Sequence, residues 1–151
     1  MNLFTKIVAT FFGIGYFPAA PGTAATAAGI AVAFFFLQGS MAVYMTVTAV
    51  LFGLGVWASG RVEAVLKQKD PGIVVIDEVA GVMIALAGLP LIWPVMIGGF
   101  FLFRAFDMFK IYPIYKLEAQ PGGWGIMLDD CMAGVYTNVI LHIALRCAGL
   151  F

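Results

Sequence analysis

The chain has 151 residues, of which 63% are hydrophobic and 11% are charged, and its eight basic residues balance its eight acidic ones. A typical soluble domain carries about 25% charged residues and presents much of its surface to water. The composition therefore excludes an ordinary soluble domain and indicates a protein of the lipid bilayer. The zero net charge gives no electrostatic reason to expect nucleic acid as a partner.

The N-terminal segment 2–12 is short and apolar, and we expect it to form a helix at the membrane interface. A secretory signal peptide is the alternative, because Ala19 and Ala20 resemble the small residues of a cleavage site. Pro21 follows them directly, however, and two glycines interrupt the apolar run before them. The interfacial helix is therefore the favoured interpretation.

Five apolar segments follow, and each is predicted to be a helix: 24–37, 41–58, 79–89, 91–103 and 131–145. No internal repeat, low-complexity linker or change in composition marks a second domain. The sequence thus predicts an all-α, multi-pass integral membrane protein with short or re-entrant helical hairpins. A single membrane-embedded domain would cover residues 1–151.

Residues 79–103 allow two interpretations. As one straight helix they would be about 37 Å long, enough to cross a hydrocarbon core of about 30 Å. If Pro90 and Pro94 break the helix, each piece reaches only about 17–20 Å, and the two must form a re-entrant or half-deep hairpin. The backbone at the tip of such a hairpin needs protein or water around it.

The placement of charges distinguishes the two interpretations. With the hairpin, seven of the eight basic residues and all eight acidic residues share one side of the membrane. With a single span, Asp107, Asp129 and Asp130 would face away from Asp77 and Glu78. Because basic residues concentrate on the cytoplasmic side, we predict the hairpin, with the charged side facing the cytoplasm.

Carboxylates mark the ends of three of these helices. Asp77 and Glu78 precede one, Asp107 follows another by four residues, and Asp129 and Asp130 precede the last. Acids at a helix N-terminus also serve as caps and complement the helix dipole, which is the structural alternative. Two adjacent pairs and a fifth acid on one side instead favour a site for a hard divalent cation such as Mg²⁺.

Two cations accompany the middle carboxylate. Arg104, Asp107 and Lys110 are spaced so that a helix places them across one face, where they can share a pocket. An Arg–Asp pair with snorkelling cations at a helix end is the structural alternative. In the functional interpretation, arginine supplies bidentate hydrogen bonds to a phosphoryl group and lysine a point charge.

Two glycine-containing segments lead into helices. Gly22 and Thr23 follow a Pro-rich turn, and the turn either ends with Thr23 as a helix N-cap or presents free N–H groups to a phosphate. Residues 122–125, Gly-Gly-Trp-Gly, are predicted to form a flexible loop before the last acidic pair.

Several mechanisms lack the residues they need. His142 is the single histidine, and it lies deep in the last apolar segment, where a packing role is expected. No Gly-x-Ser-x-Gly or Walker A motif occurs, and there is no Cys/His cluster for zinc. Cys131 and Cys147 would be about 24 Å apart on a helix, too far for a disulfide. Carboxylates, cations and a metal remain for chemistry.

At these same residues the sequence resembles the phosphatidylglycerophosphatase A family, in four stretches: 13–23, 76–81, 103–113 and 125–134. The resemblance implies a Mg²⁺-dependent enzyme of the bacterial inner membrane whose site faces the cytoplasm. It would hydrolyse the phospholipid phosphatidylglycerophosphate to phosphatidylglycerol and phosphate. The single domain would then be a phosphatase domain.

By matching positions, the resemblance implies five catalytic and metal-binding acids: Asp77, Glu78, Asp107, Asp129 and Asp130. It implies four phosphate-binding residues: Gly22, Thr23, Arg104 and Lys110. The family commonly has Lys-Pro-x-Pro where this chain has Lys110-Ile-Tyr-Pro113, so we expect the helix to extend past Lys110.

The sequence leaves several questions open. The nucleophile is either water or an aspartate that forms an aspartyl-phosphate, and the number of Mg²⁺ ions and the oligomeric state are not specified. An ion-coupled transporter is one alternative function, although its ionisable residues would be expected near the bilayer midplane. A non-catalytic membrane scaffold, with the acids as helix caps, is the other.

Overall fold

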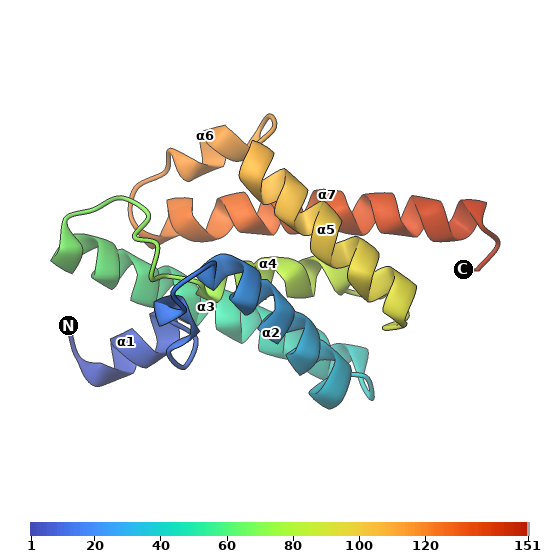
Figure 1. Ribbon diagram of the computed structural model, residues 1–151, viewed down its shortest axis with the longest axis horizontal. Helices are drawn as coiled ribbons and strands as arrows, with labels where there is room; N and C mark the ends of the chain where they lie inside the picture. Colours follow the sequence, from blue (N-terminus) through green and yellow to red (C-terminus); the bar gives the residue numbers. More distant parts are fainter. Residues whose placement is uncertain (151) are drawn as a thin grey trace.

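The computed structural model describes residues 1–150, and this part of the chain is entirely helical, with no strand. In chain order the elements are α1 (Leu3–Ala9), the 3-10 helix η1 (Ile14–Tyr16), α2 (Pro21–Phe36), α3 (Met41–Leu66), α4 (Ile76–Leu86), α5 (Trp93–Phe109), α6 (Ile114–Glu118) and α7 (Gly123–Cys147) (Figure 1). The predicted all-α class is confirmed.

Local residue chemistry sets where several helices begin. Asn2 accepts a hydrogen bond from the backbone N–H of Thr5 and caps α1, and Ser40 caps α3. Pro21 and Pro94 lie in the first turns of α2 and α5, where a missing N–H removes no helix hydrogen bond. Pro94 therefore starts α5 and does not interrupt it.

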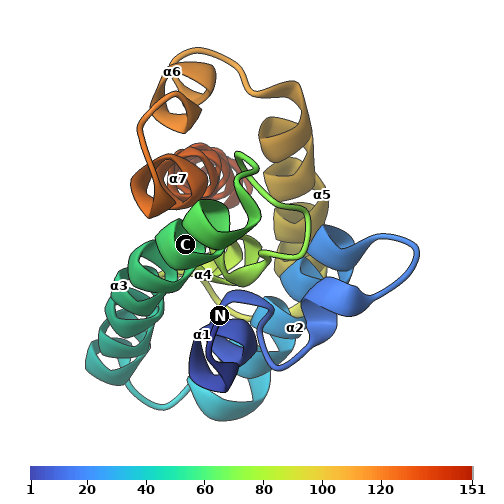
Figure 2. The same cartoon turned by 90° about the vertical axis from the view of Figure 1, so that its left-hand side faces the viewer.

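The short helix α4 lies at the centre of the molecule. Figure 2 shows it surrounded by the other helices, and it packs against α2, α3, α5 and α7. Nine of its eleven residues are buried. A helix that is apolar on every side is expected in a core, and here it is enclosed by the longer helices.

The chain turns back between α4 and α5, through residues 87–92 (Figure 1). The end of α5 thereby returns to the start of α4, and Arg104 Nη1 lies 3.7 Å from Glu78 Oε1. The predicted hairpin is confirmed, and the alternative of one straight helix over 79–103 is wrong.

Side chains of neighbouring helices satisfy the backbone at the tip of this hairpin. The last carbonyl groups of a helix have no partner within it. Tyr44 of α3 donates its hydroxyl to the Met83 carbonyl at 2.7 Å. Asn138 of α7 donates its amide to the carbonyls of Ala85 and Ala87, at 3.1 and 2.9 Å. The protein environment expected for the tip is therefore present.

Helices α4 and α7 pass close to each other at two glycines. A Cβ atom added to Gly81 would lie 2.8 Å from the Asp130 carbonyl oxygen, and one added to Gly134 would run into the Gly81 carbonyl oxygen. Small residues permit such close backbone approach. Asp77 and Asp130 each lie four residues before one of these glycines, so the contact brings both acids to the same level.

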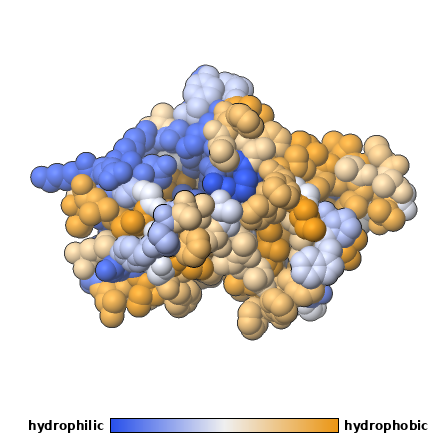
Figure 3. Space-filling view, in the orientation of Figure 1, coloured by the Kyte–Doolittle hydropathy of each residue, from blue (hydrophilic) through white to orange (hydrophobic). Residues whose placement is uncertain are grey.

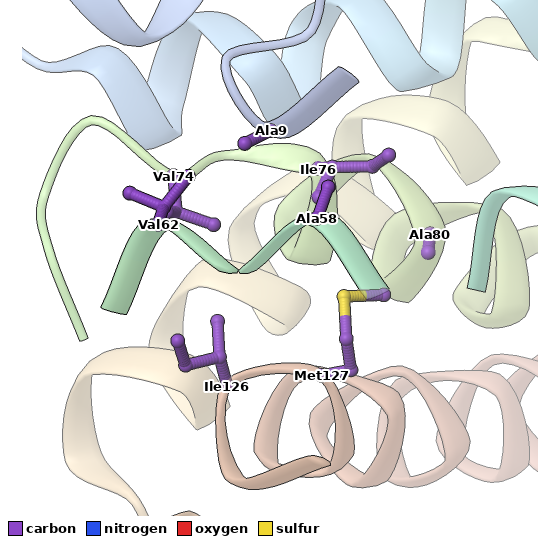
Figure 4. Close-up of a cluster of buried hydrophobic side chains, with 8 residues drawn as sticks. All are labelled: Ala9, Ala58, Val62, Val74, Ile76, Ala80, Ile126 and Met127. Atoms are coloured by element: carbon purple, nitrogen blue, oxygen red, sulfur yellow. The ribbon is translucent and has the colours of Figure 1, made fainter. Parts of the chain in front are cut away.

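A buried apolar cluster holds the start of α4 in place (Figure 4). It joins α1, α3, α7 and the loop before α4, and its members are Ala9, Ala58, Val62, Val74, Ile76, Ala80, Ile126 and Met127. The Val75 N–H also donates to the Ala9 carbonyl at 2.9 Å. These contacts fix the turn that presents Asp77 and Glu78.

The last helix begins earlier than predicted because tertiary contacts override local propensity. Helix α7 begins at Gly123, eight residues before the predicted start at 131, so most of the glycine-rich segment is helical. Gly123 lies against the Val56 carbonyl of α3, where no Cβ would fit. Only Gly122, with φ of 63°, keeps a turn conformation.

The end of α5 also differs from the prediction. The helix continues to Phe109, so Asp107 lies in its last turn and does not follow it. It stops at Lys110, which adopts a left-handed conformation with φ of 43°. The expected extension past Lys110 is therefore wrong. Other bounds also differ: α1 is shorter than 2–12, α3 runs on to Leu66, and α2 and α4 each begin three residues earlier than predicted. Asp77 and Glu78 therefore lie in the first turn of α4, and Asp129 and Asp130 lie within α7, so neither pair precedes its helix as predicted.

Many large apolar side chains are exposed on the surface. Figure 3 shows hydrophilic residues gathered toward one end and hydrophobic residues over much of the rest of this face. Phe36, Phe101 and Ile143 are 78%, 66% and 57% exposed, on three different helices. Soluble proteins rarely expose large contiguous apolar patches. Within residues 1–150, α3 alone is both long and apolar enough to cross a bilayer. Membrane association is indicated.

Adding a methyl group at the α4–α7 contact should destabilise the fold. Gly134→Ala is expected to lower the free energy of unfolding by about 1–3 kcal/mol, because the added carbon meets a backbone carbonyl that cannot move aside. Gly53→Ala on α3 is the control, since nothing lies within 4 Å of the added carbon, and it should add about 0.5–1 kcal/mol. Thermal unfolding in one detergent compares them; equal stability would contradict the close contact.

Candidate active site

A polar cavity of about 230 Å³ lies where the starts of α2 and α4 meet the end of α5 and the early turns of α7. It is lined by all nine residues predicted for the site: Gly22, Thr23, Asp77, Glu78, Arg104, Asp107, Lys110, Asp129 and Asp130. The structure therefore brings together residues that lie up to 108 positions apart in the sequence, as Gly22 and Asp130 do. Their individual roles stay predictions.

Three of the five acids form a compact cluster. One carboxylate oxygen from each of Asp77, Glu78 and Asp130 lies within 4.8 Å of the other two. One oxygen of each, namely Asp77 Oδ1, Glu78 Oε2 and Asp130 Oδ2, is buried without a hydrogen-bond partner in the described protein. Burying an unpaired carboxylate is unfavourable. A hard cation with oxygen ligands is the partner that this donor set fits.

Burial disfavours the ionised form of these carboxyl groups. Burial, reinforced by the neighbouring carboxylates, raises the pKa of Asp77 and of Asp130 well above the ordinary value. Burial raises the pKa of Glu78 to about 7, although hydrogen bonding to Asp77 and the charge of Arg104 act against it. Metal binding requires ionised ligands, so a cation would displace these protons.

Arg104 crosses the cavity between two carboxylates. Its Nη1 forms an ion pair with Asp107 Oδ2, one helical turn further along α5, and lies 3.7 Å from Glu78 Oε1. Asp107 is thus held by an arginine and stands outside the compact cluster of three acids. This arrangement keeps a guanidinium, which suits bidentate contact with a phosphate, next to the cluster.

Lys110 occupies the opposite wall. Because its backbone is left-handed at the end of α5, its side chain reaches Asp129 Oδ2 at 2.9 Å and Glu118 Oε1 of α6 at 2.8 Å. Burial lowers the pKa of Lys110, but the hydrogen bonds to these two acids outweigh burial and raise it. Burial raises the pKa of Asp129 to about 6 despite the contact with Lys110. Lys110 therefore remains a cation.

The first turn of α2 forms the third wall. Its N-cap is Ala20, which provides no side-chain cap, so the interpretation of Thr23 as N-cap is wrong. The N–H groups of Gly22 and Thr23 lie in the turn where a helix offers unpaired donors, and both residues line the cavity. A Cβ on Gly22 would run into Glu78 Oε1, so glycine allows the acid to approach the helix end.

Sequence reasoning missed two acids that belong to this environment. Asp70 lines the cavity from the loop between α3 and α4, and Glu118 binds Lys110 from α6. Burial raises the pKa of Asp70. The one signal for Asp70 was its place in a Pro-Gly turn seven residues before Asp77, and nothing in the spacing marked Glu118.

Comparison with known proteins gives consistent matches. A family model described as phosphatidylglycerophosphatase A matches residues 7–145. A Bacteroides thetaiotaomicron protein, named provisionally as a phosphatidylinositol-3-phosphatase, is 40% identical, over 91% of each chain. Proteins named phosphatidylglycerophosphatase A from Haemophilus influenzae and Escherichia coli are 37% and 34% identical, covering 89% and 90% of this chain and 85% and 80% of their own. No solved structure gives a significant match.

The protonated cluster makes the stability of the metal-free protein depend on pH. The pKa of Glu78, about 7 in the folded state, lies above its ordinary 4.5, so folding retains a proton that the unfolded chain releases between these values. The free energy of unfolding in chelator should therefore be highest below pH 4.5 and fall as the pH rises through 7. Thermal unfolding across this range measures the slope.

Glu78→Gln is expected to make that slope shallower. It should not remove the slope, because the pKa values of Asp77, Asp129 and Asp130 are shifted in the same direction. Glu63→Gln, an identical change outside the cavity, is the control and should keep the slope of the parent protein. An unchanged slope in Glu78→Gln would count against a buried, protonated Glu78.

Proposed function

The chain belongs to the phosphatidylglycerophosphatase A family and is a phosphatase, and we propose that it hydrolyses phosphatidylglycerophosphate to phosphatidylglycerol and phosphate in the bacterial inner membrane. The observation that carries this proposal is the cavity at the polar end of apolar helices. There, three buried carboxylates with unpaired oxygens stand beside Arg104 and Lys110. That combination suits a metal and a phosphate together.

Mg²⁺ is the cofactor in this proposal, held by Asp77, Glu78 and Asp130. Their unpaired oxygens and their raised pKa values both favour a hard divalent cation in that position. Bound Mg²⁺ would act as a Lewis acid that offsets the negative charge of the phosphoryl group. All other functions in the reaction fall to the side chains and backbone of the protein.

Arg104, Lys110 and the first turn of α2 would bind the phosphate. Each cation contacts carboxylates in the structure, so an incoming phosphate exchanges one anionic partner for another and leaves no charge unpaired. The N–H groups of Gly22 and Thr23 add donors at a helix N-terminus, where an anion is favoured.

Asp107 and Asp129 are the two predicted carboxylates left for proton transfer. Each is held by a cation, Arg104 or Lys110, and each lines the cavity. In the proposed reaction a water oxygen bonds to phosphorus as the bond from phosphorus to the glycerol oxygen breaks. One of these carboxylates accepts the proton from water, and the leaving glycerol oxygen takes up a proton from solvent.

The chain would be a multi-pass membrane protein with this cavity on the cytoplasmic side. The alternating directions of α2, α3, α4, α5 and α7 support that arrangement (Figure 1). The gathering of hydrophilic residues toward one end also supports it (Figure 3). An ion-coupled transporter is less well supported, because the acids share one cavity that two cations also line.

A phosphoinositide phosphatase is the second candidate. The observation in its favour is the 40% identical relative whose provisional name specifies phosphatidylinositol 3-phosphate. Both substrates are phosphate monoesters of membrane lipids, so the same catalytic groups would serve either of them.

Phosphate release from phosphatidylglycerophosphate should require Mg²⁺ and stop on chelation. Asp130→Asn should lower kcat/KM by about 100-fold or more, because it removes a ligand from the buried cluster. It should also reduce the rise in melting temperature that Mg²⁺ gives the parent protein. Malachite-green phosphate assays and thermal unfolding measure the two effects.

Glu63→Gln is the matched control for this experiment and should retain the activity of the parent protein. Full activity in Asp130→Asn would overturn the assignment of the cluster. Absence of phosphate release from the parent protein, with Mg²⁺ present, would favour the transporter or the scaffold.

The cavity should also discriminate between the two candidate lipids. The two lipids differ next to the phosphate, which is attached to a flexible glycerol in one and to a six-membered ring in the other. We expect kcat/KM for phosphatidylglycerophosphate to exceed that for phosphatidylinositol 3-phosphate by about tenfold or more. Parallel assays in identical mixed micelles decide this, and the reverse preference would select the second candidate.

A further inference from the structure

A second hollow, of about 190 Å³, lies between α2 and α5, and we call it the α2–α5 groove. Ala27 and Ile30 form its α2 wall, and residues between Trp93 and Phe101 form its α5 wall. Every side chain that lines it is apolar, in contrast to the charged lining of the active-site cavity. The groove opens on the exposed face of the two helices, where Phe101 is 66% exposed.

The lining of the active-site cavity is followed by the lining of the groove along both helices. Thr23, in the cavity, lies four residues before Ala27, in the groove, on α2. Arg104, in the cavity, lies three residues after Phe101, in the groove, on α5. Residues three or four apart share one face of a helix. On both walls, therefore, the polar lining gives way to the apolar lining within one helical turn.

Cavity and groove together have about the length of one leaflet of a bilayer. The groove itself runs from Trp93 to Phe101, eight residues or about 12 Å along α5, and Arg104 in the cavity lies eleven residues, about 16 Å, from Trp93. Half of a hydrocarbon core is about 15 Å thick. The rings of Phe34 and Trp93, with centroids 6.1 Å apart, join the two helices at the end of the groove far from the cavity.

We propose that the α2–α5 groove holds an acyl chain of the phospholipid substrate, so that the lipid enters sideways between α2 and α5 and its chain stays at bilayer depth. The proposal rests on the proposed function, because that function places a lipid headgroup phosphate in the cavity. A phosphate bound beside Arg104 and Thr23 would place the acyl chains of its lipid next to the α2–α5 groove. Burial of methylene groups there favours long-chain substrates.

Filling the groove should weaken the preference for long chains. The measured quantity is kcat/KM for the diacyl lipid divided by kcat/KM for its deacylated headgroup. Ala27→Phe places a ring in the groove and should lower this ratio about tenfold, which corresponds to lost contact with about two methylene groups. Ala49→Phe, the same change at an exposed position of α3, should leave the ratio as in the parent protein.

Phe101→Ala tests the opposite wall with little risk to folding, because its side chain is mostly exposed. It should lower the same ratio by removing apolar contact with the chain. A ratio unchanged in both Ala27→Phe and Phe101→Ala would overturn the proposal. So would an equal loss for both substrates, since that indicates damage to the cavity.

Photolabelling tests the groove without relying on turnover. The probe is phosphatidylglycerophosphate with a diazirine in one acyl chain, at low mole fraction in phosphatidylcholine vesicles that contain the protein. Label on α2 and α5 should be displaced by excess unlabelled substrate, whereas label on the exposed face of α3 should not. Ala27→Phe should reduce the displaceable label and Ala49→Phe should not.

The two methods separate the possible failures. If the parent protein releases no phosphate from either substrate, the proposed function fails, and displaceable labelling still decides whether the groove binds this lipid. If phosphate is released but the displaceable label lies elsewhere, the groove assignment is wrong. A cross-link between two copies of the chain at α2 and α5 would also overturn it, because a protein partner would then occupy the groove.

Discussion

The contact between α4 and α7 at Gly81 and Gly134 is the constraint on which the candidate site depends. The two helices run in the same direction, and neither glycine has room for a Cβ atom. Because Asp77 and Asp130 each lie four residues before one of these glycines, the register of the contact is also the register of the acids. A wider separation would keep both helices intact and yet disperse the carboxylates. Packing in the apolar core therefore sets the geometry of the polar site.

Taken alone, the arrangement of the carboxyl groups destabilises the folded protein. Three largely buried carboxyl groups with unpaired oxygens destabilise the chain if they are ionised, and burial raises their pKa values for this reason. The apolar cluster beneath them, centred on Ile76 and Met127, supplies compensating burial (Figure 4). Arg104 and Lys110 neutralise carboxylates at the edge of the cluster but leave its centre without a partner. A cation bound at this centre, as proposed, would supply the missing partner.

Much of the site could be predicted from sequence because charge placement constrains topology. A hairpin over 79–103 was the arrangement that put Asp107 on the same side as Asp77, and the chain does turn back there. Contacts between distant segments could not be predicted. Gly123 suggests a loop by local propensity, yet packing against α3 draws it into α7, and Glu118 reaches Lys110 through a fold of α6 that no spacing encodes. Local patterns located the charged residues but not their partners.

The hairpin also explains how an acidic site and an apolar groove come to lie end to end. In the proposed membrane arrangement, α4, with only eleven residues or about 16 Å, would end at roughly half the depth of the bilayer. Hydrogen bonds from Tyr44 and Asn138 make that buried end stable, which allows the chain to return at once as α5. Helix α5 then rises beside α2 over one leaflet and delivers Arg104 to the polar end. A full-length span in place of α4 would have carried Arg104 to the other side of the membrane, away from every carboxylate it contacts.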